Sequence, residues 1–276
     1  MSGRFIVGAG GAGEIWTSGV VSDFAECVLA PNPSAWTLDG TNTWIIGAVD
    51  GPCVVVDPGP LNNGHREAII DALERRNAKP AAVLLTHGHI DHSEGAVELA
   101  DHLGVAVRAW SPEFSSRGDE NTLVNGDRID VQGAELMVLA TPGHSSDSVC
   151  FLVEDCVFTG DTVLGRGTSL IAHPDGQLGE YLLSLQALAD VCFERGVRAL
   201  MPGHGPVLEE PTNVVEGYLA HRRDRLQQVA LAMRDGAVSA REIVERVYVG
   251  IPAEVIPAAE ATVRAQLHYL AELRSS

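Results

Sequence analysis

Three histidines and one aspartate lie within the seven-residue run THGHIDH, which starts at Thr86. The run follows the apolar, β-prone segment AAVLL, so we expect a buried strand with these polar residues in the loop at its end. In locally extended backbone His87 and His89 point the same way, while Asp91 and His92 come from the turn that opens the next helix. Imidazole nitrogens and carboxylate oxygens at this spacing indicate a metal site that could serve two adjacent cations.

Three later segments repeat the order of an apolar strand followed by one potential ligand. His144 follows the strand in MVLATPGHS, Asp161 follows CVFTG, and His204 follows RALMPGHG. A single histidine beside glycine and proline is typical of a turn, but the three segments together form a set in which glycines allow tight turns. We therefore expect these residues to complete the metal site.

The elements that must position these residues alternate along the chain to about residue 210. Helical periodicity is found in residues 65–78, 93–104 and 179–196, with Ser93 as the expected N-cap of the second helix and Gly104 at its end. Mixed strands with interleaved helices predict an α/β protein, a layered sandwich with helices outside the sheets. The predicted strands occupy residues 42–49, 53–59, 81–89, 105–110, 134–144, 148–161 and 197–205.

The strands stop after Pro211. Residues 214–236, 239–250 and 258–274 predict three amphipathic helices, with Ser239 as an N-cap. We therefore expect a catalytic domain at 1–212 and a small helical domain at 213–276 that covers one side of the active-site groove. The basic cluster HRRDR, residues 221–225, is typical of a solvated helix face.

Composition limits the function classes. The formal net charge of −18 is carried by the first 210 residues, which disfavours binding to phosphate backbones. Without an 18-residue apolar window or a secretory leader, we expect a cytoplasmic protein with no membrane partner. The five cysteines are odd in number and lack a C-x-x-C pair, which predicts small buried hydrophobic residues.

A glycine-rich run at residues 8–13, GAGGAG, fits the spacing G-x-G-x-x-G of a dinucleotide-binding turn. The residues after it are β-branched, lack helical periodicity and run into two prolines. A glycine turn is therefore the preferred interpretation, and a dinucleotide site is disfavoured.

The pattern H-x-H-x-D-H, followed by the three later ligands, resembles that of the metallo-β-lactamase-fold hydrolases over residues 1–210. The resemblance implies an αββα sandwich and two Zn²⁺ ions, with iron or manganese as alternatives in one or both sites. The two cations would lower the pKa of a shared water that Asp91 orients. The implied ligands are His87, His89 and His144 on one metal, Asp91, His92 and His204 on the other, and Asp161 bridging both.

A closer resemblance extends over nearly the whole chain. The segments NPSAWTLDGTNTWIIG, FTGDTVLGRGTSLI and MPGHGPVLEEP are similar to those of the β-lactamase-like protein 2 branch, near the glyoxalase II thioesterases. The branch includes enzymes that cleave thioesters, lactams or single-stranded RNA. It also implies a winged-helix-like C-terminal domain.

Other polar residues give weaker indications. Asp57 in VVVDPG either holds a ligand histidine from outside the centre or caps a turn. The loop of residues 164–173 either shapes the rim of the site or contacts substrate. Four histidines in helical stretches receive no role: His65, His102, His221 and His268. The substrate contacts predicted in the loop are Arg166, Thr168, Ser169 and His173.

We expect a metal-dependent hydrolase that attacks an ester or thioester carbonyl, as glyoxalase II does. A single-strand endoribonuclease and a lactam hydrolase are alternatives, as is a nucleic-acid-binding protein with a structural metal. The acidic charge and the 5% aromatic content favour a small acyl substrate over RNA. The resemblance to true zinc β-lactamases is incomplete, because those enzymes commonly have a cysteine at the position of Asp161. Lactam hydrolysis is therefore disfavoured. A homo-oligomer is left open.

Overall fold

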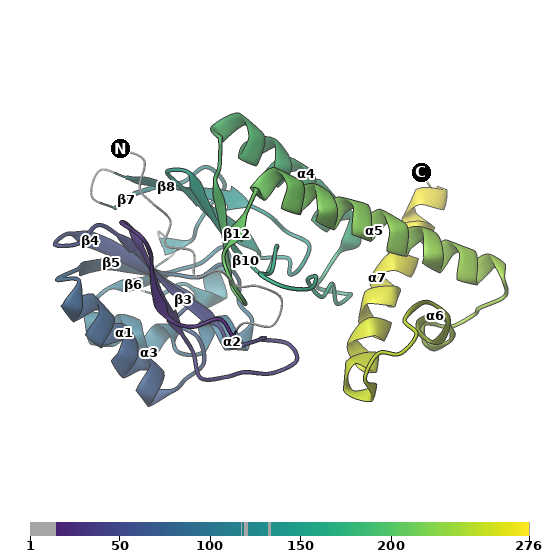
Figure 1. Cartoon of the computed structure of the whole chain (residues 1–276), viewed down its shortest axis with the longest axis horizontal. Helices are drawn as coiled ribbons and strands as arrows, with labels where there is room; N and C mark the ends of the chain where they lie inside the picture. The colour runs from purple at the N-terminus through teal and green to yellow at the C-terminus, as the bar shows by residue number, and fades with distance from the viewer. Residues whose placement is uncertain (1–14, 117, 119–120, 132–133, 276) are drawn as a thin grey trace.

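The structure is a computed structural model that describes residues 15–116, 118, 121–131 and 134–275. The predicted glycine turn at residues 8–13 lies outside the described residues. Two six-stranded sheets pack face to face, and helices cover the outer face of each sheet (Figure 1). The predicted α/β sandwich with helices outside the sheets is therefore confirmed.

The first sheet has its strands in the order of the sequence. The first four strands pair antiparallel, whereas β4, β5 and β6 are parallel. Parallel neighbours need crossover connections, and α1 (Asn63–Arg75) and α3 (Ala96–Leu103) provide them. The strands are β1 (Gly19–Ser22), β2 (Ala25–Leu29), β3 (Asn42–Gly47), β4 (Pro52–Val56), β5 (Lys79–Leu84) and β6 (Ala106–Arg108).

The second sheet runs in the order β12-β11-β10-β9-β8-β7. Among its described strands only β10 and β11 pair in parallel, and α4 (Leu178–Arg195) connects them. The single strand predicted at residues 148–161 is wrong: it is a hairpin, because the chain reverses at Glu154, which has a φ of 52°. The strands are β7 (Arg128–Asp130), β8 (Glu135–Ala140), β9 (Val149–Val153), β10 (Cys156–Gly160), β11 (Ala199–Pro202) and β12 (Leu208–Glu209).

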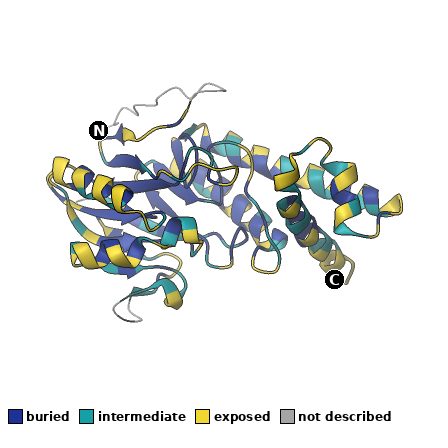
Figure 2. Ribbon diagram, turned by 90° about the horizontal axis from the view of Figure 1, so that it is seen from below, coloured by how far each residue is buried: buried dark blue, intermediate teal, exposed yellow. Residues whose placement is uncertain are grey.

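Apolar side chains alternate between the two faces of the strands. One face packs between the two sheets, and the other packs against the outer helices. Trp44 and Ile46 of β3 point between the sheets and pack with Phe158 and other residues of the second sheet. Ile45, between them, points outward and packs in the layer that contains Ile69 of α1. Figure 2 shows the buried strands at the centre and the helices with exposed outer faces.

The predicted N-cap at Ser93 is wrong. The sequence there forms two helices, α2 (Ile90–Ser93) and α3, and Gly95 is the N-cap residue of α3. Ser93 instead donates a hydrogen bond through its Oγ to the backbone oxygen of Gly88, at 2.9 Å. Gly104 ends α3 in the left-handed conformation, as predicted.

The C-terminal part consists of α5 (Pro211–Arg234), α6 (Ala240–Val247), the 3-10 helix η3 (Ala253–Val255) and α7 (Ile256–Ser275). Ser239 is the N-cap of α6, as predicted, and accepts a hydrogen bond from the Glu242 amide. Figure 1 shows α5 lying along the sandwich and continuing beyond it, where it carries α6 and α7. The described residues 211–275 contain no strand, so the winged-helix detail stays unconfirmed.

The N-terminal half of α5 packs with α4 against the second sheet, through Val215 and Leu219. Its C-terminal half enters a separate apolar cluster, in which Val229 packs with Ile243 of α6 and Val263 of α7. One helix thus belongs to two cores. The division at residue 212 stays a prediction.

The structure also bears on the cysteines and on membrane-spanning helices. All five cysteines are free and buried, as predicted. Among the described residues, no helix combines the length and the apolarity that crossing a membrane requires.

Candidate metal centre

The predicted ligands come together at one edge of the sandwich, because each follows the end of a strand. His87 and His89 follow β5, and the short helix α2 that comes next carries Asp91 and His92. The other three follow strands of the second sheet: His144 comes after β8, Asp161 directly after β10, and His204 after β11. Both sheets therefore contribute to one cluster.

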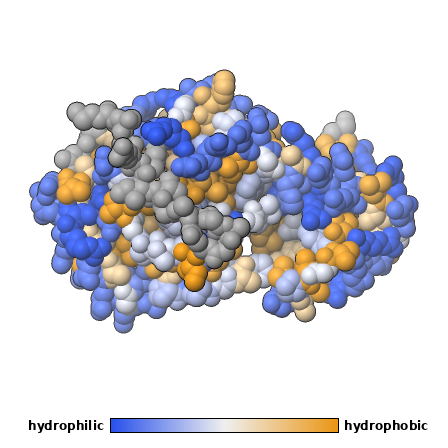
Figure 3. Space-filling model, in the orientation of Figure 1, coloured by the Kyte–Doolittle hydropathy of each residue, from blue (hydrophilic) through white to orange (hydrophobic). Residues whose placement is uncertain are grey.

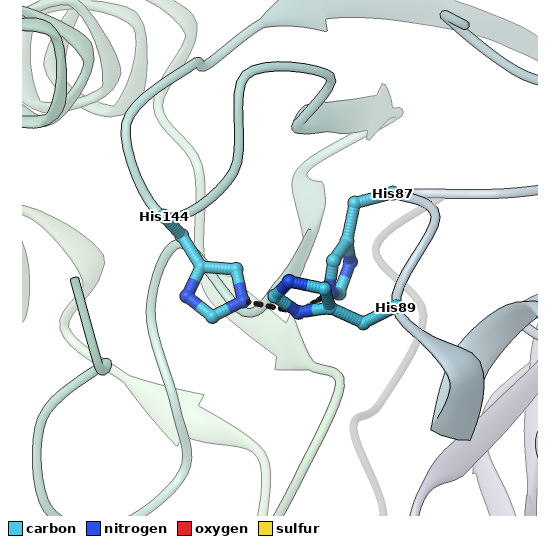
Figure 4. A group of neighbouring side chains, drawn as sticks. All are labelled: His87, His89 and His144. Atoms are coloured by element: carbon cyan, nitrogen blue, oxygen red, sulfur yellow. Dashed lines mark hydrogen bonds between the residues drawn. The ribbon is translucent and has the colours of Figure 1, made fainter. Parts of the chain in front are cut away.

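Three histidine nitrogens converge in the first group (Figure 4). The Nδ1 atom of His89 lies 3.0 Å from Nε2 of His87 and 3.0 Å from Nε2 of His144. Tetrahedral zinc with bonds of about 2.0–2.1 Å separates its nitrogen ligands by about 3.3 Å. The three nitrogens are therefore spaced so that they could hold one cation.

A second group lies beside the first and consists of Asp91, His92 and His204. The Nε2 atoms of the two histidines are 3.2 Å apart. Oδ2 of Asp91 is 3.2 Å from Nε2 of His204 and 3.6 Å from Nε2 of His92. These distances also suit a single tetrahedral cation.

Asp161 lies between the two groups. Its Oδ2 atom is 3.8 Å from Nε2 of His144 in the first group and 3.4 Å from Nε2 of His204 in the second. Its Oδ1 atom is buried and has no hydrogen-bond partner among the described residues. A buried carboxylate oxygen without a hydrogen bond is costly even though Nε2 of His92 lies 3.5 Å away, and a bound cation would satisfy it. The carboxylate thus fits a bridging ligand.

Four of the five clustered histidines direct Nε2 toward the centre and Nδ1 toward an acceptor in the protein. Such an outer hydrogen bond fixes the tautomer and the ring orientation, so that Nε2 is left free for a cation. The four outer contacts are His87 to Thr86 Oγ1 (3.0 Å), His92 to Asp57 Oδ2 (2.9 Å), His144 to the Leu170 carbonyl (2.7 Å) and His204 to the Gly40 carbonyl (3.2 Å).

Asp57 supports a histidine in each group. One of its oxygens accepts hydrogen bonds from His92 and from the Thr86 hydroxyl, and that hydroxyl in turn contacts His87. Its other oxygen accepts from the Thr86 amide at 2.8 Å. Asp57 is almost fully buried and has a φ of 51°, so the surrounding structure holds it in a left-handed conformation. The role of Asp57 in holding a ligand histidine stays a prediction, which its contact with His92 supports.

Sequence reasoning assigned no role to Asn42 and Trp44, which hold the loop of His204 in place. The Asn42 amide donates to the carbonyls of Pro202 (2.9 Å) and Gly205 (2.8 Å), and the Trp44 indole donates to Pro202 (3.0 Å). These bonds tie a strand of the first sheet to a loop of the second. The available signal was a polar residue at the start of the apolar strand NTWIIG.

Burial and neighbouring charge perturb the titration of the cluster in the absence of metal. Burial and the neighbouring histidines hold the pKa of His87 well below its usual value, which keeps its nitrogens neutral. Burial opposes protonation of His204, but Asp161 and Asp91 outweigh it and raise its pKa to about 10. His204 would therefore release a proton when a cation binds at neutral pH.

The centre opens into a cavity of about 440 Å³. His89 and His144 of the first group lie on its wall, as do Asp91 and His204 of the second group and Asp161 between them. A molecule in the cavity would therefore lie against both groups. The segment from α5 through α7 also contributes residues to the lining. We expected this C-terminal part to cover one side of the groove.

The loop after β10 contributes three of its four predicted substrate contacts to the cavity wall: Arg166, Thr168 and Ser169. Arg166 pairs with Asp39, and the hydroxyl of Ser169 donates to the carbonyl of Asp161 at 2.5 Å. His173 is not among the described lining residues and instead stacks on His268, with ring centroids 4.5 Å apart.

The prediction that HRRDR forms a solvated face is wrong for part of the cluster. Arg222 is only 3% exposed, because its guanidinium lies over the Tyr181 ring and donates to the carbonyl of Ser169. His221 and Arg225 line the cavity with it. Helical spacing alone could not indicate this burial, which depends on how the loop of residues 164–170 packs against α5.

Comparison with known proteins places these residues in a family. The sequence model of the Metallo-beta-lactamase superfamily matches residues 36–115, a range that holds the first four predicted ligands. Lactamase-like protein adaB from Aspergillus niger is 32% identical over 277 residues, covering 92% of this chain and 82% of that protein. The chain belongs to the metallo-beta-lactamase superfamily.

Two further relatives match most of the chain. An atrochrysone carboxyl ACP thioesterase from Aspergillus fumigatus is 32% identical over 86% of this chain and 77% of its own length. A beta-lactamase-like protein 2 homolog from Drosophila melanogaster is 31% identical over 89% of this chain and 86% of its own length. This metallo-beta-lactamase superfamily protein is a hydrolase.

Solved structures agree with the superfamily fold. A beta-lactamase domain protein from Burkholderia ambifaria superposes with a TM-score of 0.78 at 20% identity, over 98% of this chain and 92% of that one. A metallo-beta-lactamase family protein from Thermus thermophilus gives a TM-score of 0.73 at 23% identity, over 90% of this chain and 93% of that one. The high coverage of this chain indicates that the fold likeness extends into the C-terminal helices.

Proposed function

We propose that this hydrolase is a metal-dependent thioesterase with a dinuclear centre, of glyoxalase II type. The observation that carries the proposal is that both ligand groups open into one cavity large enough for an acyl group. Hydrolysis would break the C–S bond of an acyl thioester with one water, releasing a carboxylic acid and a thiol. The proposed ligands are His87, His89 and His144 for one cation, Asp91, His92 and His204 for the other, and Asp161 between them.

Two Zn²⁺ ions, or iron or manganese in either position, would supply an activated water and Lewis-acid stabilisation of the developing negative charge. Within the chain, Asp91 lines the cavity and can orient the water and accept its proton. Burial raises the pKa of Asp91, but the hydrogen bond from His204 and the charges of His92 and His204 together outweigh burial and lower the pKa to about 2. The carboxylate is therefore ionised at neutral pH, as a proton acceptor must be.

The lining of the cavity favours an acyl substrate. Trp36, Leu38 and Leu164 line it, as do Ile251 and Val255 from the C-terminal part. Apolar side chains stabilise an acyl group by removing it from water. RNA would instead need a basic path with stacking aromatics, which an acidic chain with 5% aromatic residues provides poorly. A relative named as a thioesterase supports the same choice.

The proposal is tested with metal-reconstituted protein and three substrates: an acyl thioester, a cyclic lactam and a short single-stranded RNA. We expect wild type to hydrolyse the thioester. His89→Ala should lower kcat/KM at least 100-fold, because it removes one of the three nitrogens proposed to hold the first cation. Thiol release, measured with a chromogenic reagent, reports the reaction.

The matched control is His102→Ala, which removes an exposed histidine from α3, away from the cavity. It should retain full activity and metal content. Equal thioester turnover by wild type and His89→Ala would refute the proposed centre, and cleavage of RNA or lactam alone would refute the proposed substrate.

A further inference from the structure

Two arginines of α5 line the cavity without an acidic partner. Among the described residues, neither Arg222 nor Arg225 forms an ion pair, whereas Arg166, which also lines the cavity, pairs with Asp39. Arg222 is 3% exposed, and its buried Nε has no hydrogen-bond partner. A buried cation without a counter-charge is costly, so this arrangement suits a ligand that brings the charge.

The remaining contacts hold the two guanidinium groups but leave donors unused. Arg222 donates to the Ser169 carbonyl, and its guanidinium carbon lies 5.1 Å from the centroid of the Tyr181 ring. Arg225 donates through Nη1 to Val247 and Gln228 and lies over the Tyr248 ring, at 4.7 Å. Each guanidinium has five N–H donors in a planar fork that matches a carboxylate.

The rest of the cavity defines what accompanies the anion. Ile251, Val255 and Ala258, from the segment that leads into α7, give it an apolar wall on the C-terminal side. In Figure 3 the surface is notched between the catalytic part and the C-terminal helices, with hydrophobic residues gathered on the helical side. Five of the proposed metal ligands belong to the same lining: His89, Asp91, His144, Asp161 and His204.

We propose that Arg222 and Arg225 form a carboxylate-binding subsite, so that the preferred substrate is a thioester that also carries a negatively charged carboxylate. The inference rests on the proposed thioesterase function and adds the chemical class of its substrate. The thioester carbonyl lies at the metal centre, the carboxylate pairs with the arginines, and the apolar wall contacts the carbon chain between them. A bidentate pair in a partly dehydrated cavity gives selectivity between charged and neutral substrates.

The carboxylate could belong to the acyl arm or to the thiol arm, and paired substrates separate the two. Butyryl and glutaryl thioesters of the neutral thiol N-acetylcysteamine differ by a carboxylate on the acyl arm. Butyryl thioesters of N-acetylcysteamine and of glutathione compare a neutral thiol with a carboxylate-bearing one. In one of these pairs we expect wild type to prefer the charged substrate by about tenfold or more in kcat/KM.

Arg225→Gln is the main variant and should reduce this preference by about tenfold. Arg223→Gln is its matched control, because Arg223 is exposed on the same helix and does not line the cavity. It removes the same charge and should leave both rates and their ratio unchanged. Arg222→Gln is a second variant, used only if its melting temperature shows that it folds.

A readout independent of catalysis separates the subsite from the thioesterase activity. Calorimetric titration with glutarate should show at least tenfold weaker binding to Arg225→Gln than to Arg223→Gln. Arginine-dependent glutarate binding without hydrolysis of any thioester would overturn the proposed function and leave the subsite standing. Equal preference ratios and equal glutarate affinities in the two variants would overturn the subsite.

Discussion

Asp57 connects the two ligand groups on the side away from the cavity. Its carboxylate contacts His92 directly and His87 through the Thr86 hydroxyl, so one buried side chain orients a histidine for each proposed cation. Hydrogen-bond partners of this kind typically change metal affinity by about 10- to 100-fold when they are lost. The proposed centre therefore depends on a residue that does not face the cavity.

Asp57→Asn tests this dependence. Asparagine tolerates the left-handed backbone at this position, but its amide NH₂ cannot accept the hydrogen bonds that one carboxylate oxygen receives. We expect metal affinity to fall by about 10- to 100-fold, measured by competition with a chromophoric chelator. Asp71→Asn, on the exposed face of α1, is the control and should bind metal as wild type does. Unchanged affinity in Asp57→Asn would show that the contact is dispensable.

The sequence predicted the histidines of the cluster better than it predicted the groups that hydrogen-bond to them. His144 and His204 could be predicted because each polar residue stands out after an apolar run that ends in glycine and proline. The carbonyls of Gly40 and Leu170 could not be predicted as their partners, because a backbone acceptor has no residue-type signature. Their contact depends on the distance between loops far apart in the chain.

The loop after β11 owes its position to a glycine. A Cβ atom on Gly203 would lie 2.6 Å from Oδ1 of Asp161 and 2.8 Å from Cε1 of His92. These distances are shorter than van der Waals contact, so any side chain would displace the Asp161 carboxylate, the histidine or the loop. The close approach of β11 to the cluster thus requires glycine.

Gly203→Ala should lower metal affinity and kcat/KM at least tenfold while the melting temperature stays close to that of wild type. Gly217→Ala is the contrasting variant, because a Cβ there meets nothing within 4 Å in α5. It should raise the free energy of unfolding by about 0.5–1 kcal/mol with activity unchanged. Thermal unfolding and metal titration of both proteins provide the comparison, and wild-type metal affinity in Gly203→Ala would contradict it.

Elements with strong local signals could be predicted, and those that depend on packing could not. The end of α3 at Gly104 and the cap of α6 at Ser239 follow from residue preferences within one turn. The burial of Arg222 depends instead on Tyr181 of α4 and on the loop of residues 164–170. Neither neighbour is visible in the spacing of residues along α5.

The cavity exists because the C-terminal helices lie beside the cluster of predicted metal ligands. Ala258 of α7 lines it, although about 54 residues of chain separate this alanine from His204. The composition of the C-terminal helices predicted a helical unit but not which face it would turn to the site. We expect substrate size to be limited at this wall.

Ala258→Trp should raise KM for an acyl thioester about tenfold, because the indole would occupy part of the cavity of about 440 Å³. Metal content should not change. Ala271→Trp places the same side chain on an exposed position of α7 and is the control. If Ala258→Trp has a wild-type KM and a wild-type melting temperature, the substrate does not reach this wall.

The double membership of α5 restricts how this enzyme could diversify. Its first turns complete the outer layer over the second sheet, and its last turns pack with α6 and α7. Replacement of the whole C-terminal part would therefore expose Leu185 and its neighbours to solvent. New specificities must therefore accumulate by single substitutions along the cavity wall. A library confined to the cavity-facing positions of α5 and α7 would sample them without cutting the shared helix.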